Sequence, residues 1–173
     1  MTVLKETAAL LRSLRDVWDE DAVDELDHAL QSAARAIDDR ADDELVLAAA
    51  LHDVAHSPLF DPSDAARHDV AARDWLTPRF GARVGWLAGA HVAAKRYLVA
   101  TDPQYPLSPT SALSLTAQGG PGMDDDLVAH PWWPDALRLR RYDDAAKDPA
   151  ATGATIEHVL AIAERVRQQQ DPS

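Results

Sequence analysis

The sequence predicts an all-α protein that folds as a compact helical bundle. Apolar residues recur at spacings of three and four along most of its 173 residues, as they do on the buried face of a helix. Alternation of apolar and polar residues, which is typical of a half-buried strand, never holds for four residues between turn signals. The chain has neither an internal repeat nor a linker-like segment, and its length suits one core. We therefore predict a single domain over residues 1–173.

The first three helices are predicted from apolar residues at helical spacing. They cover residues 4–17, 23–37 and 45–60. A polar break separates the first two, and His28 interrupts the apolar stripe of the second. The third helix begins with a continuous apolar run, and Pro58 and Pro62 are expected to end it, because proline lacks the amide hydrogen that a helix interior needs.

The later helices are marked by capping residues, prolines and glycines. Ser63 and Asp64 are candidate N-caps. The proline-rich segment TDPQYPLSP is expected to be a loop, and Gly119 and Gly120 should end the helix that follows it. Pro134 suits a first helical turn. The predicted ranges are 64–75, 81–100, 108–118 (with Ser108 or Thr110 as the starting residue), 124–129, 134–147 and 155–169.

Charge and composition limit the partners. The formal net charge of −12 without a Lys/Arg cluster argues against binding of duplex nucleic acid. A small anionic substrate remains compatible with this charge if the pocket carries its own cations. The absence of cysteine excludes disulfides and thiolate ligands, so a metal site would be built from nitrogen and oxygen donors. No apolar run of 18 residues and no secretory leader is found, and we expect a cytoplasmic location without membrane contact.

The segment LHDVAH at residues 51–56 carries the strongest chemical signal. It follows an apolar run, so His52 and Asp53 are expected at the inner end of a buried segment. On a continuous helix, His52 and His56 would lie about 40° apart. Burying such a pair is costly without a partner, and a metal ion would be one. The alternative is that these are hydrogen-bonded core residues.

The other candidate ligands lie on separate predicted helices, where each polar residue interrupts a packing face. Five of the predicted helices carry them: His28, His52 with Asp53, His68, His91, and either Asp143 or Asp144. Spacing does not choose between the two aspartates. His130 and His158 are interpreted as structural or surface residues. Five interrupted faces predict a metal site in the bundle core.

Two cations accompany these candidates. Lys95 follows His91 by four residues, and Arg140 precedes Asp143 by three, so each shares a helix face with a candidate ligand. Cations beside a metal would bind a phosphonate or carboxylate group. The alternative is that both side chains lie on solvated helix edges.

The order His28, His52-Asp53, Asp143 resembles the H…HD…D signature of the HD-domain superfamily. The intervening His68 and His91 make the pattern similar to its mixed-valent di-iron oxygenases. Within these it resembles the phosphonate-degrading branch that contains 2-amino-1-hydroxyethylphosphonate oxygenase, and more distantly inositol oxygenase. The resemblance covers most of residues 23–147. It rests on HALQ, LHDVAH, HVAAKRYL, LSPTSALSLTAQGG and LRRYDDAAK.

The resemblance implies a helical bundle of the HD-domain type and two irons as an Fe(II)/Fe(III) pair, with no organic cofactor. One iron would be held by His28, His52, Asp53 and Asp143, and the second by Asp53, His68 and His91, with Asp53 bridging. O2 and a small hydroxylated organophosphonate would be the substrates, and cleavage of the C–P bond would release phosphate. His56 and Lys95 would be catalytic, and Lys95, Ser111 and Arg140 would contact the anionic group.

One departure concerns the loop before His28. Where the phosphonate branch has a Tyr-x-x-Glu pattern that closes the pocket, this chain has Trp18 and Asp21. We expect both to bind substrate, with Asp21 facing an amino or trialkylammonium group and Trp18 offering its ring face. Two alternatives remain. One is a metal-dependent phosphohydrolase with the same ligands, acting on a phosphate ester or nucleotide. The other is a binding or scaffold protein with a vestigial site.

Overall fold

The computed structural model describes residues 2–170, and the predicted all-α class is confirmed there. Residue 1 and residues 171–173 of the predicted domain lie outside the described part. Within it the chain forms α-helices and two 3-10 helices and no strand. The elements are α1 (Val3–Ser13), α2 (Glu25–Asp38), α3 (Asp43–Leu51), η1 (Val54–His56), η2 (Pro62–Arg67), α4 (His68–Phe80), α5 (Ala82–Thr101), α6 (Pro109–Ala117), α7 (Asp125–Val128), α8 (Trp133–Ala145) and α9 (Ile156–Gln170).

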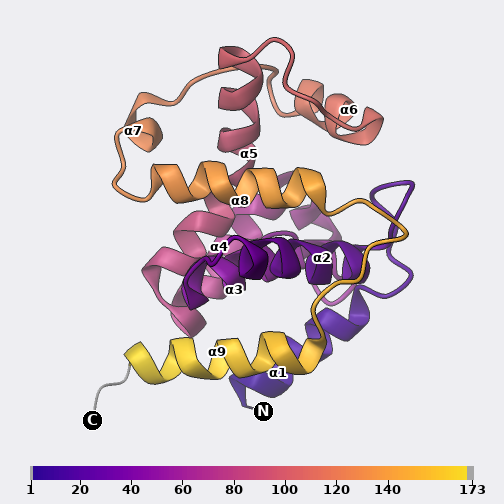
Figure 1. Cartoon of the computed structure of the whole chain (residues 1–173), viewed down its shortest axis with the longest axis vertical. Helices are drawn as coiled ribbons and strands as arrows, with labels where there is room; N and C mark the ends of the chain where they lie inside the picture. Colours follow the sequence, from indigo (N-terminus) through magenta and orange to yellow (C-terminus); the bar gives the residue numbers. More distant parts are fainter. Residues whose placement is uncertain (1, 171–173) are drawn as a thin grey trace.

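Helix α3 is the centre of the bundle. It packs against α2, α5, α8 and α9. Figure 1 shows α8, the α2–α3 pair and α9 as successive layers, and α5 runs across them. Every residue from Leu45 to Leu51 is buried, so this helix has no polar face, as expected of a core helix. Burying each of its leucines contributes about 1.5–3 kcal/mol.

The end of α3 differs from the prediction of one helix over residues 45–60. The α-helix stops at Leu51 with His52 as its C-cap, and the tighter turn η1 follows. The amides of His56 and Ser57 bond the carbonyls three residues earlier. Ser57 is extended (ψ 137°), because the following Pro58 disfavours the helical region for it. The proline signal was therefore right, but the helix ends earlier than predicted.

The fourth predicted helix, residues 64–75, is also corrected. Asp61 rather than Ser63 or Asp64 is the cap, since its side chain accepts the Ser63 amide at the start of η2. Helix α4 begins only at His68 and continues past residue 75 to Phe80. Burial of Phe80 against the core holds this last turn despite the internal Pro78. Gly81, with φ 91°, ends the helix.

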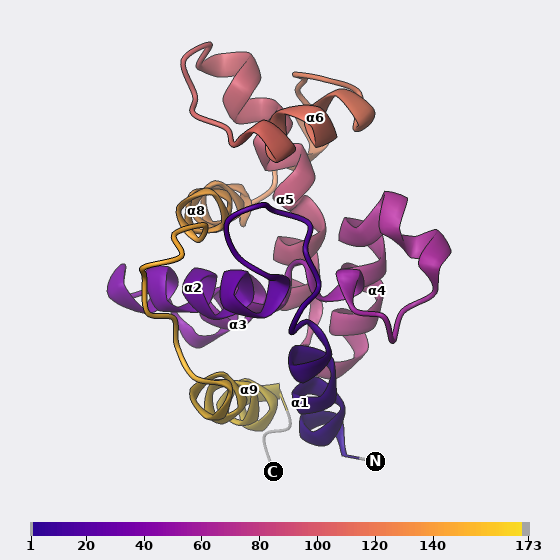
Figure 2. The ribbon, with the colours of Figure 1, turned by 90° about the vertical axis from the view of Figure 1, so that its right-hand side faces the viewer.

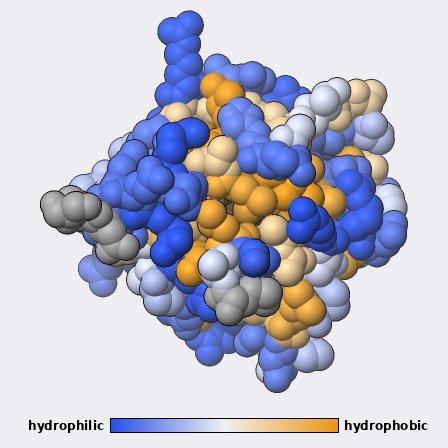
Figure 3. Space-filling model, turned by 90° about the horizontal axis from the view of Figure 1, so that it is seen from below, coloured by the Kyte–Doolittle hydropathy of each residue, from blue (hydrophilic) through white to orange (hydrophobic). Residues whose placement is uncertain are grey.

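Helix α5 connects the core of the bundle to the part of the chain that contains α6. It packs on α4 and α8, and Figure 2 shows it rising beyond α8 toward α6. Ser108 caps α6 by accepting the Ser111 amide, which decides between Ser108 and Thr110, the two predicted starting residues. At the opposite end, seen in Figure 3, apolar side chains gather within a polar surround. Among residues 2–170, no helix is both long and apolar enough to cross a membrane.

Candidate functional site

The structure brings together the histidines and aspartates that interrupt the apolar faces. They come from five places: α2 (His28), the end of α3 (His52 and Asp53), the start of α4 (His68), α5 (His91) and α8 (Asp143). The early end of α3 matters here. Because Asp53 leaves the helical conformation (φ −102°, ψ 15°), its carboxylate lies between the histidines instead of continuing the helix face.

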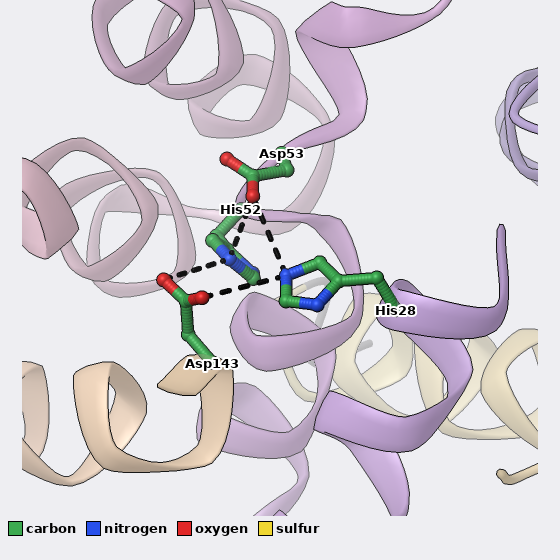
Figure 4. A group of neighbouring side chains, drawn as sticks. All are labelled: His28, His52, Asp53 and Asp143. Atoms are coloured by element: carbon green, nitrogen blue, oxygen red, sulfur yellow. Dashed lines mark ion pairs between the residues drawn. The ribbon is translucent and has the colours of Figure 1, made fainter. Parts of the chain in front are cut away.

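The first half of the cluster consists of two histidines and two aspartates (Figure 4). The Nε2 of His28 lies 3.5 Å from both Asp53 Oδ2 and Asp143 Oδ1. The Nε2 of His52 lies 3.1 Å from Asp53 Oδ2 and 3.3 Å from Asp143 Oδ2. One ligand atom from each residue lies within 4.8 Å of all the others. This is a set of four donors around one point.

The second half of the cluster surrounds the other oxygen of Asp53. Its Oδ1 lies 3.3 Å from His91 Nε2, 3.5 Å from His68 Nε2 and 3.9 Å from His56 Nε2. The two oxygens of one carboxylate thus face two separate groups of imidazoles. Such an arrangement would allow one carboxylate to bridge two metal positions.

Backbone carbonyls orient the imidazole rings. The Nδ1–H groups of His28, His52 and His91 donate to carbonyl oxygens at 2.9, 2.9 and 2.6 Å, and that of His68 donates at 3.4 Å. Such bonds select the tautomer whose Nε2 carries a lone pair. All four lone pairs therefore belong to the nitrogens that face the cluster.

These nitrogens need a cation. The Nε2 atoms of His68 and His91 are 3.1 Å apart, so with both Nδ1 atoms protonated their lone pairs repel unless a metal ion or proton lies beside them. His52 Nε2 and Asp53 Oδ1 are buried without a hydrogen-bond partner, which is costly in an empty core. Imidazole and carboxylate donors suit iron. The residues present therefore fit a metal pair.

Both carboxylates are held in the charged form that a metal ligand needs. Burial alone raises the pKa of Asp143, but the charges of Arg140 and His52 outweigh burial and hold that pKa well below its usual value. In the metal-free protein, where protons can take the place of the metal on these Nε2 atoms, burial opposes ionisation of Asp53, but the His52 charge and hydrogen bonds from His28 and others lower its pKa well below normal.

The structure distinguishes Asp143 from Asp144. Asp143 faces the cluster, and its Oδ2 accepts Arg140 Nη1 at 2.7 Å. Asp144 lies away from the cluster, where it pairs with the Arg140 guanidinium and accepts the Tyr105 hydroxyl at 2.6 Å. Arg140 therefore binds both aspartates. Although it borders the cavity, its charge is already paired.

A cavity of ≈ 240 Å³ opens onto the cluster. Lys95, Ser111 and Ser114 line it, and Lys95 Nζ donates to Ser114 Oγ at 2.8 Å. Within residues 2–170, no carboxylate lies within 4.0 Å of this ammonium. Burial, reinforced by the Arg140 charge, lowers the pKa of Lys95 to about 8. Lys147 is different, because it pairs with Glu20 at 2.7 Å and donates to Ser111 Oγ at 2.8 Å.

The structure does not bring Trp18 and Asp21 to this cavity. Trp18 is 61% exposed, Asp21 is exposed as well, and Asp19 and Glu20 line the wall instead. The bends that run from residue 19 to residue 23 turn the backbone so that different side chains face inward. Sequence reasoning did not identify Glu20, although the acidic run around it was a signal.

Lys147 and Glu25 also line the cavity and were not identified from the sequence. Lys147 lies four residues after Asp143, and this helical spacing was a signal in the sequence, whereas Glu25 at the start of α2 had none.

The two remaining histidines lie outside the site, as predicted. His130 stacks on Trp86 with ring centroids 4.1 Å apart, and His158 is exposed on α9. Neither histidine lies among the residues that line the cavity.

A helical bundle with a core His/Asp cluster in the order H…HD…D is an HD-type metal centre. No protein-family model matches the chain. Curated proteins do match it, and two of them are named for an activity. The chain is 37% identical over 142 residues to the hydroxymethylphosphonate dioxygenase of Gimesia maris, covering 74% of this chain and 70% of that protein. It is 35% identical over 133 residues to the 1-hydroxy-2-(trimethylamino)ethylphosphonate dioxygenase (glycine-betaine-forming) of Leisingera caerulea, covering 70% and 67%.

The chain belongs to the phosphonate dioxygenase family, the phosphonate-degrading branch of the HD-domain oxygenases. The predicted resemblance to this branch is confirmed, and the protein is an oxygenase enzyme with a His/Asp metal-binding cluster. Both relatives are named as dioxygenases, so they favour oxygen chemistry over the phosphohydrolase and scaffold alternatives.

Proposed function

We propose that this protein is a di-iron dioxygenase that cleaves the C–P bond of a small 1-hydroxyphosphonate and releases phosphate. The observation that carries the proposal is Asp53, whose two oxygens face separate imidazole groups, at 3.1–3.5 Å on one side and 3.3–3.9 Å on the other. A mononuclear hydrolase would need only the first group. The substrate class is supported by the names of the two relatives.

His28, His52, Asp53 and Asp143 would hold one iron, and Asp53, His68 and His91 the other. When bound, a non-haem iron pair supplies the O2 and electron-transfer chemistry that side chains lack. Cleavage of hydroxymethylphosphonate by one O2 to formate and phosphate balances without another reductant. The proposed reaction therefore needs no organic cofactor to supply electrons.

Lys95 would bind the phosphonate group, because it is a buried cation in the cavity wall that pairs with no carboxylate of residues 2–170. The hydroxyls of Ser111 and Ser114 lie on the same wall and would add hydrogen bonds.

Arg140, which we expected to contact the anionic group of the substrate, is given a different role. Its guanidinium holds Asp143 and Asp144, so we assign it to the orientation of a metal ligand rather than to direct substrate binding.

His56 would be a catalytic residue beside the second metal position. Its ring packs against that of His68, with centroids 4.6 Å apart, and it lines the cavity. Its Nε2 is farther from Asp53 than those of His68 and His91. Asp53, His56 and His68 are close enough to hold a metal ion together, but with His68 and His91 assigned to the second metal we assign His56 to a hydrogen bond with substrate.

The test combines metal analysis with turnover. Protein loaded with iron without air should contain two irons per chain and give, when partly oxidised, the EPR signal of a coupled Fe(II)/Fe(III) pair. With hydroxymethylphosphonate it should consume O2 and release phosphate in equal amounts. Hydrolysis of phosphate esters without O2 uptake would refute the proposal in favour of the phosphohydrolase.

A further inference from the structure

Glu25 is a buried carboxyl group in the cavity wall that the proposed chemistry does not use. It is 2% exposed, lines the cavity together with His28 and Asp53, and its Oε2 has no hydrogen-bond partner. Burial raises its pKa to about 8. A buried polar oxygen without a partner costs about 1–3 kcal/mol, so a ligand that satisfies it gains affinity.

The position of Glu25 complements that of Lys95. The charged groups that act on Lys95 include Arg140, Asp143 and Asp53. Those that act on Glu25 include His28, Asp53 and Asp19. Asp53 acts on both groups and lines the cavity with them, so the cation and the carboxyl border one cavity beside the metal-binding cluster.

The remaining wall supports a polar rather than an aromatic mode of recognition. No Phe, Tyr or Trp within residues 2–170 lines the cavity, and Trp18 lies outside it. A methylated ammonium group, which aromatic faces bind well, therefore finds no such face here. Of the other acidic wall residues outside the metal-binding cluster, Glu20 is paired with Lys147 and Asp19 is exposed.

We propose that Glu25 is a specificity-determining residue that accepts a hydrogen bond from an O–H or N–H group on the carbon chain of the substrate, while Lys95 holds the phosphonate. The inference rests on the proposed function for the identity of the anion. It predicts that a short phosphonate with a hydrogen-bond donor on its carbon chain binds more tightly than one without, because only the donor satisfies the Glu25 oxygen.

Binding measurements without O2 test this on the metal-loaded protein. Calorimetry would give the dissociation constants of methylphosphonate, which has no donor, and of hydroxymethylphosphonate and aminomethylphosphonate, which carry O–H and N–H donors. In Glu25→Leu, affinity for at least one donor ligand should fall about tenfold or more, while that for methylphosphonate stays within about twofold. The ligand that loses affinity identifies the donor.

Two further variants complete the design. Glu25→Gln keeps the shape and one acceptor oxygen, so it should retain the preference for the O–H donor better than Glu25→Leu. Asp27→Asn is the matched control, since Asp27 is also in the first turn of α2 but pairs with Arg15 away from the cavity. It should change none of the three constants.

Equal changes for all three ligands in Glu25→Leu, or no change for any, would overturn the proposal. Iron content and thermal unfolding of each variant separate a binding effect from a folding effect. O2 uptake by the wild-type protein tests the proposed function separately. The three dissociation constants test the role of Glu25 even if that uptake is absent.

Discussion

Replacement of Asp53 by alanine should remove both metal ions, because this one carboxylate faces both imidazole groups. Its Oδ2 lies 3.1 and 3.5 Å from His52 and His28, and its Oδ1 lies 3.3 and 3.5 Å from His91 and His68. Loss of either oxygen alone would remove a ligand from one position. Loss of the whole carboxylate removes a ligand from both and eliminates the negative charge that offsets two cations.

The size of the effect follows from mass action. At free iron one hundred times the dissociation constant, each bound ion stabilises the folded state by about 2.7 kcal/mol, so two independent ions contribute about 5.4 kcal/mol. For a chain of this length each kcal/mol corresponds to about 2–4 °C. The melting temperature of Asp53→Ala in iron should therefore lie about 11–22 °C below that of the loaded wild type.

The assay is metal analysis together with calorimetric unfolding, with and without chelator. Iron should fall from two per chain to less than one, and chelator should lower the melting temperature of the wild type but not of the variant. Asp69→Asn removes a half-buried carboxylate next to His68 that is not among the cluster residues, and it is the control that should keep both ions. Two tightly bound irons in Asp53→Ala would refute the bridging role.

Three further predictions address the second metal, the anion site and the scaffold. His68→Ala and His91→Ala should each lose one of two irons in metal analysis, and retention of both with full O2 uptake would contradict the two-metal assignment. Lys95→Ala should weaken phosphonate binding by about 10- to 100-fold in calorimetry. Since the ammonium must be charged to hold an anion and its pKa is about 8, wild-type affinity should fall as pH rises through that value, whereas an unchanged affinity up to pH 9.5 would argue against this role. Arg83→Met breaks ion pairs with three carboxylates of α8 and the start of α3, so it should lower unfolding free energy by about 1.5–3 kcal/mol without loss of iron, and stability equal to wild type would show that the network contributes nothing.

The sequence by itself determined the helical class and pointed to the histidines and aspartates of the candidate metal site. Both depend on local information. The spacing of apolar residues sets which face of a helix is buried, and a polar residue that interrupts such a face, such as His28 or His91, is visible without coordinates. The order of histidines and aspartates then carried the resemblance that the comparisons confirmed.

Only the tertiary structure decided which side chains from distant segments meet. It separated Asp143 from Asp144, paired Arg140 with both, and replaced Trp18 by Glu20 at the cavity wall. It also ended α3 at Leu51. Spacing along one helix predicts the helix face on which a side chain lies, but not which other side chain it contacts. These contacts depend on how the helices pack. A buried carboxyl such as Glu25 is recognised only when its surroundings are known, because burial belongs to the fold and not to the residue.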